Sequence, residues 1–174
     1  MRNALRTTLA LAVVVSGRIA AASEPEMRLL ARKDPSAGIA IDVDPSLVQN
    51  DADEKAIRNQ VELAMRRCGF KVLAQPYNLS SRTSAIIAVV ANGLPLSGGF
   101  AGNVELRVRT VETVRGEIVL VEIFTEGIIF TGPSGTAGMQ IRDTLARSLD
   151  KFSNQYLQAR DEVGAKTKGP TPKK

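Results

Sequence analysis

The chain of 174 residues is long enough for one domain with its own core, and 44% of the residues are hydrophobic. There is no histidine and a single cysteine, Cys68, which excludes Ser-His-Asp and Cys-His catalysis, histidine-based zinc sites and an internal disulfide. Tryptophan is absent and aromatic residues make up 4%, so a surface that binds bases or partners through aromatic anchors is not expected.

The net charge of +5 does not indicate nucleic-acid binding once the charges are located. Residues 1–22 hold three arginines and no acid, and the tail after Glu162 holds four lysines and no acid. Residues 23–162 between them carry a formal charge of −2. The body of the chain therefore has no basic excess for binding phosphate groups, and we expect no nucleic-acid partner.

Residues 1–22 predict a cleavable signal peptide of bacterial type. Arginines precede an apolar run over 9–15, and three alanines supply a small-residue cleavage site before Ser23. The run is shorter than the roughly 18 residues of a membrane-spanning helix. A buried N-terminal helix or strand is the alternative interpretation. The signal predicts a periplasmic or secreted protein with no transmembrane segment after its removal.

Residues 15–18 bear on membrane anchoring. Val15-Ser16-Gly17 matches the three residues that precede the lipid-modified cysteine of bacterial lipoproteins, or is a chance run of small residues. Arginine has no thiol to acylate, so Arg18 predicts a protein without a lipid anchor.

Residues 23–37 contain prolines and a cluster of charges, and they predict a linker. The following segment 39–43 alternates in polarity and is ended by Pro45, which predicts a first strand. Asp42 and Asp44 share its polar face. They are either a solvated face before an Asp-Pro turn or part of a cation site, for which no third acidic ligand lies nearby in the sequence.

The segment from Asp51 to Cys68 predicts an amphipathic helix that ends at Gly69. Its apolar stripe consists of Ile57, Val61, Ala64, Met65 and Cys68. Cys68 is therefore predicted to be a core residue; the alternative is a reactive thiol, which needs exposure and a lowered pKa.

After this helix, residues 70–74 form either a short strand or an extended continuation, and the apolar run 85–91 predicts a central strand covered on both faces. Residues 92–103 predict a loop because they contain four glycines and a proline. The apolar residues Leu94, Leu96 and Phe100 of this loop are candidate partner-contact residues. Alternatively, they fold back and close the end of the sheet.

Residues 104–130 predict a long hairpin that turns at Arg115-Gly116. With that turn Val114 pairs with Glu117, Thr110 with Val121, Val108 with Ile123 and Leu106 with Thr125. The face toward the core then carries Val104, Leu106, Val108, Thr110, Val119, Val121 and Ile123. On the other face Arg109 meets Glu122 favourably, whereas Glu105 meets Glu126 unfavourably.

The glycine-rich segment 132–138 is either a turn with Ser134 or Thr136 as a helix cap, or a phosphate-binding loop that lacks the Gly-Lys-Ser/Thr sequence. A second amphipathic helix is predicted over 139–160, packed on the sheet. Residues 161–174 predict a disordered basic tail.

Together these elements predict an α+β fold. We expect a two-layer sandwich in which a mixed or antiparallel sheet of about four strands carries two helices on one face, in the order βαβββα. This single domain covers residues 38–160.

The export signal, the helix sequence Ala56-Ile57-Arg58-Asn59-Gln60-Val61-Glu62-Leu63-Ala64-Met65-Arg66-Arg67-Cys68-Gly69-Phe70, and the hairpin with its terminal helix resemble the small envelope domains of uncharacterised bacterial lipoproteins. They are distantly similar to the N-terminal domain of the propeller protein of the Tol-Pal system. The resemblance covers about residues 38–160 and departs at Arg18, where lipoproteins would have their anchoring cysteine. It implies an interaction role in the envelope and assigns no functional residues.

These observations predict an exported, non-enzymatic envelope protein that binds another envelope protein as an interaction or assembly module, without a cofactor or a metal. Two alternatives stay open. One is a small-ligand binder or hydrolase that uses carboxylates such as Asp42, Asp44 and Glu122, and the other is a structural subunit of a surface assembly. The oligomeric state does not follow from the sequence.

Overall fold

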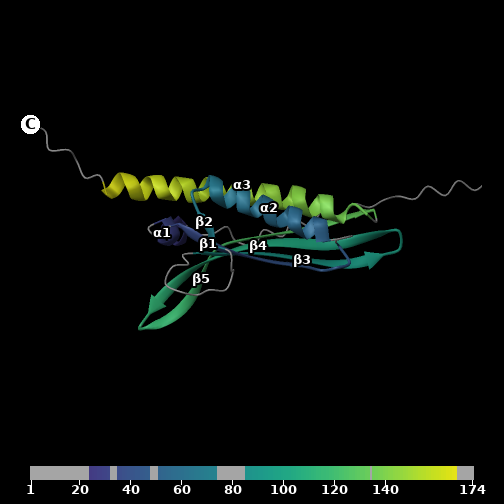
Figure 1. Cartoon of the computed structure of the whole chain (residues 1–174), viewed down its shortest axis with the longest axis horizontal. Helices are drawn as coiled ribbons and strands as arrows, with labels where there is room; N and C mark the ends of the chain where they lie inside the picture. The colour runs from purple at the N-terminus through teal and green to yellow at the C-terminus, as the bar shows by residue number, and fades with distance from the viewer. Residues whose placement is uncertain (1–23, 32–34, 48–50, 74–84, 134, 168–174) are drawn as a thin grey trace, which may run out of the picture.

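A computed structural model of the chain describes residues 24–31, 35–47, 51–73, 85–133 and 135–167 (Figure 1). The expected signal peptide over 1–22, including Arg18, lies outside the described residues. In the described part the order of elements is α1 (Glu24–Ala31), β1 (Ser36–Val43), α2 (Asp51–Arg67), β2 (Lys71–Leu73), β3 (Ala85–Leu96), β4 (Gly99–Val114), β5 (Glu117–Pro133) and α3 (Ala137–Thr167).

The fold is α+β, as expected, with a mixed sheet of five strands in the order β2-β1-β3-β4-β5. Strand β1 runs parallel to β2 and β3, whereas β3, β4 and β5 form an antiparallel meander. Helices α2 and α3 lie side by side over one face of this sheet (Figure 1). The segment after α2 is a strand of three residues, β2, which together with α1 enlarges the expected order.

The core lies between this helix pair and the sheet, because both helices bury the stripe that their spacing predicts. The stripe of α3 is formed by Ile141, Leu145, Leu149, Phe152 and Tyr156, each at most 2% exposed. Phe152 meets Phe124 of β5 edge to face at 5.5 Å between ring centroids. Cys68 is buried at the end of α2, as the stripe predicted, and its carbonyl accepts a bond from Arg160 Nη1 at 3.2 Å.

The central hairpin turns at Arg115-Gly116 as predicted, but its register changes at a β-bulge beside Val108 and Arg109. From Val114 to Arg109 the predicted pairs are confirmed, including Arg109 with Glu122. Beyond the bulge, Val108 pairs with Phe124 and Leu106 with Glu126, so the predicted partners Ile123 and Thr125 are wrong by one residue.

The bulge buries Ile123 and Phe124 next to each other, each 1% exposed, because an extra residue interrupts the alternation of faces. It also separates the two carboxylates whose repulsion the simple register predicted: Glu105 pairs with Gly127 rather than Glu126. Glu126 instead turns toward α3, where its Oε1 accepts a bond from Lys151 Nζ at 2.8 Å.

The predicted loop over 92–103 is wrong: these residues are the end of β3, a tight turn and the start of β4. Gly99 serves close packing within the sheet, since a Cβ on it would lie 2.6 Å from the carbonyl oxygen of Gly132, whereas Gly98 lies in the tight turn with a positive φ of 80°. Pro95 is tolerated because the pairing of β1 with β3 ends at Ala91, which leaves Pro95 at an edge.

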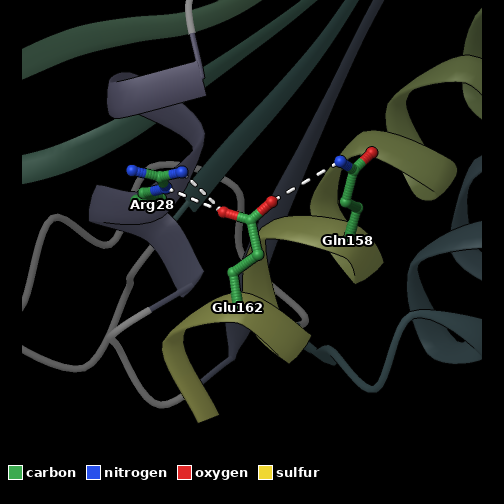
Figure 2. A network of polar contacts seen from close by, with 3 residues as sticks. All are labelled: Arg28, Gln158 and Glu162. Atoms are coloured by element: carbon green, nitrogen blue, oxygen red, sulfur yellow. Dashed lines mark hydrogen bonds and ion pairs between the residues drawn. The ribbon is translucent and has the colours of Figure 1, made fainter. Parts of the chain in front are cut away.

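The predicted linker over 23–37 is also wrong where it is described, because Glu24–Ala31 form α1 and β1 begins at Ser36. The segment is charged overall, but Met27 and Leu30 lie one helical turn apart and are buried. Figure 2 shows how α1 is joined to α3: Arg28 Nη2 and Nε donate to Glu162 Oε2 at 2.6 and 3.1 Å.

The predicted disordered tail over 161–174 starts too early. Helix α3 continues to Thr167, and its last turns carry Glu162, which is bonded to both Arg28 and Gln158 (Figure 2). Residues 168–174 lie outside the described part. Charge and low hydrophobicity suggested disorder here, but a tertiary contact with α1 extends the helix.

Candidate functional site

The face of the sheet opposite α2 and α3, which we call the open face, carries charged side chains from β1, β4 and β5. Alternation along paired strands places one side chain from each strand in a row across this face. One such row contains Ala40, Ala88, Arg107 and Thr125, and the next contains Asp42, Val90, Glu105 and Gly127. The centre of the face is therefore polar, and its ends are apolar.

Charges in the centre of this face are paired with one another. Arg107 Nη2 lies 2.6 Å from Glu105 Oε2, and Arg109 Nε lies 3.5 Å from Glu122 Oε2. The hydrogen bond that Arg107 donates to Glu105 raises the pKa of Arg107 above its ordinary value. Within each of these partly exposed pairs the two charges neutralise each other, which leaves Asp42 as the exposed carboxylate of the same row.

The acids considered for hydrolysis do not converge. Asp42 is exposed on β1, whereas Glu122 is on β5, with β3 and β4 between them in the sheet. Asp44 Oδ1 accepts a bond from the Ser46 amide at 2.8 Å, which lowers the pKa of Asp44 and forms the turn before Leu47. Glu122 is therefore not brought to Asp42 across the sheet, and the carboxylate alternative, which requires at least two acids in one concave pocket, stays a prediction.

No group of three or more acids or cysteines is placed to hold a metal ion within the described residues. The same part of the chain contains no helix long and apolar enough to cross a membrane.

The three candidate contact residues, which the sequence placed in a loop, lie on different faces of the sheet. Leu94 and Leu96 are 62% and 51% exposed on the open face. Ile129, two strands away from them on the same face, is 61% exposed. Phe100 points to the helix side, is 6% exposed and meets Phe130 edge to face at 5.6 Å. Phe100 closes the end of the core and is not available to a partner.

A second exposed apolar surface lies at the opposite end of β4, beside the predicted turn. The prediction that Val119 faces the core is wrong, since Val119 is 38% exposed. We call residues 111–120 the hairpin arm. Figure 1 shows β4 and β5 leaving the layer of helices and ending in this arm. Its exposed apolar residues are Val114, Ile118, Val119 and Leu120, between 38% and 56% exposed. The sequence signal for this surface is the uninterrupted apolar run over 118–121, because a strand with one face in solvent normally alternates between apolar and polar residues.

The glycine-rich segment before α3 is a turn in which Thr136 precedes the helix. The Thr136 hydroxyl donates to the Pro133 carbonyl at 2.9 Å, and the Gln140 amide donates to the Thr136 carbonyl at 3.1 Å. Residue 134 lies outside the described part. Anion binding by this segment stays a prediction.

No protein-family model matches the sequence, and no curated protein matches it either. Several solved structures resemble the chain. The PelC dodecamer from Paraburkholderia phytofirmans is 14% identical, with a TM-score of 0.43 over 72% of this chain and 91% of that chain. A minor lipoprotein from Acinetobacter baumannii is 9% identical, with a TM-score of 0.36 over 76% of this chain and 94% of that chain.

The rare lipoprotein B from Shewanella oneidensis is 7% identical, with a TM-score of 0.32 over 76% of this chain and 98% of that chain. These structures include bacterial lipoproteins, the kind of protein that the sequence resembles. The likeness to the Tol-Pal propeller protein stays an expectation. With each TM-score below 0.5, none of these similarities carries an argument about function.

Proposed function

We propose that this chain is an exported envelope protein that binds another envelope protein and does not itself catalyse a reaction. The observation that carries the proposal is the pair of exposed apolar surfaces at the two ends of the sheet. One end presents Leu94, Leu96 and Ile129, and the other end presents the hairpin arm. Apolar side chains that gather on a surface, rather than scattering singly, mark interaction sites in soluble proteins.

Export is the second premise, and it rests on the sequence of residues 1–22. Mass spectrometry of the mature N-terminus tests it directly. We expect a chain that begins at Ser23 and carries no lipid. A chain that retains its first 22 residues would contradict export.

Binding is tested in the producing cell with a photo-crosslinking amino acid placed at Leu94, and in a second strain at Asn92, which lies in the same strand and is also exposed. We expect a discrete protein adduct from position 94 and a weaker one from position 92, because the apolar contact centres on Leu94 and Leu96. Light scattering of the purified protein accompanies this experiment. An adduct with a second copy, together with a mass that rises with concentration, would support the structural-subunit alternative instead.

A further inference from the structure

Strand β5 forms one outer edge of the sheet, and at the hairpin arm it leaves the rest of the sheet behind. Within the described residues the pairing of β3 with β4 ends at Thr110, and the tip of the hairpin, residues 113–118, is a two-stranded ribbon. Such a ribbon is marginally stable in water without a third strand or a covering layer. The hairpin arm is exposed to solvent, and its strands are rich in residues that favour a sheet.

The turn determines which backbone groups point outward from β5. Arg115 and Gly116 both have positive φ, 53° and 88°, as a type I′ hairpin turn requires. In such a hairpin the residues flanking the turn form a hydrogen-bonded pair, and bonded and non-bonded pairs then alternate. Val114 with Glu117 is the first bonded pair, so the N–H and C=O groups of Ile118 and Leu120 point away from β4.

The rest of the β5 edge carries features that discourage the addition of another strand. The register shifts beside Ile123, Glu126 points inward to Lys151, and Gly127 and Pro133 follow. Bulges, inward charges, glycine and proline are the devices by which proteins protect edge strands. Residues 117–122 have none of them, and they present the run Ile118-Val119-Leu120-Val121 between two glutamates.

We propose that residues 117–122 of β5 accept an extended segment of another protein by strand addition. The added strand would have apolar residues facing Ile118 to Val121 and basic residues facing Glu117 and Glu122. Main-chain bonds from the outward groups of Ile118 and Leu120 would hold it, and the facing side chains would select it. This inference rests on the proposed function. It specifies what kind of segment would bind at the hairpin arm, one of the two exposed apolar surfaces.

A second copy fits this edge less well than a segment with basic ends. Because the outward groups belong to Ile118 and Leu120, two antiparallel β5 strands can pair about Leu120, which places Glu122 of each copy opposite Ile118 of the other. In that register neither glutamate faces a basic residue. A lipid surface is disfavoured because the outward backbone groups and Glu117 would lose water without gaining hydrogen bonds.

The test uses fluorescent capped peptides and the purified full-length protein. The peptides are Lys-Val-Thr-Ile-Val-Lys and Glu-Val-Thr-Ile-Val-Glu, and binding is measured by anisotropy at low salt. We expect the lysine-ended peptide to bind on the order of tenfold more tightly than the glutamate-ended peptide. The charge pair at Glu117 changes sign, and the pair at Glu122 changes sign while Glu122 also contacts Arg109 at 3.5 Å. Added salt should reduce that ratio.

Three variants identify the edge that is used. Leu120→Pro removes an outward N–H of β5 without removing a bond to β4, and it should abolish peptide binding. Thr113→Pro removes the equivalent N–H at the other edge of the ribbon and should leave binding unchanged. Glu117→Lys with Glu122→Lys should reverse the order of the two peptides; this result does not depend on how well the proline variants fold.

The inference is overturned if neither peptide binds, if the two bind equally at low salt, or if Thr113→Pro rather than Leu120→Pro abolishes binding. Binding of the protein to anionic phospholipid vesicles that Leu120→Pro leaves intact and that competes with the peptide would also overturn it. The proposed function is judged separately: an adduct at position 94 without peptide binding at the arm removes this inference and leaves the interaction role in place.

Discussion

The two halves of the β4–β5 hairpin contain similar apolar residues, but one half is buried and the other is exposed to solvent. At the base, Val104, Leu106 and Val108 are at most 2% exposed, because α3 lies over them. At the arm, Val114 and Val119 of the same face are 52% and 38% exposed, although the same two strands continue to the turn. The comparison teaches that alternation along a strand defines its faces, whereas burial depends on what lies over each face.

Stability and interaction are therefore expected to separate along one hairpin. Substitutions at the base should alter the free energy of unfolding. Substitutions at the arm should leave that free energy nearly unchanged and alter association with a partner. Four substitutions test this separation, in order of expected effect.

The largest effect is expected where α3 meets the base of the hairpin. Phe152→Ala removes a ring that is fully buried against Phe124 and stacked on Tyr156 at 6.0 Å between centroids. We expect the free energy of unfolding to fall by about 3–5 kcal/mol in urea titrations. Leu63→Ala, on the outer side of α2 and 51% exposed, is the matched control and should change it little. Equal losses in both variants would contradict the assigned core.

The next effect concerns the close packing at the other end of β4. Gly99→Ala places a Cβ 2.6 Å from the backbone oxygen of Gly132, which cannot move aside as a side chain would. A loss of about 1–3 kcal/mol is expected. Gly164→Ala in α3 meets no atom within 4 Å and should instead stabilise the protein by about 0.5–1 kcal/mol. Thermal unfolding of both variants checks the opposite signs.

A smaller effect appears at alkaline pH. Burial raises the pKa of Tyr156 above its ordinary value of 10.0. The native state therefore keeps the neutral phenol where the unfolded chain ionises, so stability is full below pH 10 and falls as the pH rises toward the native pKa. Urea midpoints measured between neutral pH and pH 11 should decline less steeply for Tyr156→Phe than for the wild type. Parallel declines would show that this tyrosine does not couple to folding.

The smallest effect on stability is expected at the arm. Leu120→Thr exchanges an exposed apolar residue for a polar one that also favours strands. The free energy of unfolding should therefore change by less than about 0.5 kcal/mol. The same variant should weaken binding of the lysine-ended peptide, measured by anisotropy. A loss of stability as large as that of Phe152→Ala would mean that the arm is part of the core, and the comparison would fail.

Much of the fold could be predicted because it depends on local patterns. The stripe of α3, from Ile141 to Tyr156, repeats at helical spacing, and the same spacing predicted the burial of Cys68 directly after α2. The turn at Arg115-Gly116 and the pairs near it followed from counting outward from that turn. The predicted register is wrong from the point where an extra residue, Ile123, interrupts the ladder, and a period of two contains no information about such an interruption.

The candidate site was predictable only in part. Leu94 and Leu96 are exposed as the partner interpretation required, whereas Phe100 follows the alternative in which the residue closes the core. The strands containing them were mistaken for a loop because glycine and proline are the usual signals of a turn. At Gly99 the cause is instead a neighbouring backbone that is remote in sequence.

By itself the sequence determined which segments are amphipathic, where the central hairpin turns and that the body of the chain lacks basic excess. Only the tertiary structure decided that Arg28 and Glu162 join α1 to the end of α3, that Glu105 and Glu126 are kept apart, and that one apolar run of β5 remains in solvent. The reason is physical: periodicity arises within a segment, but burial and charge pairing arise between segments that meet only after folding.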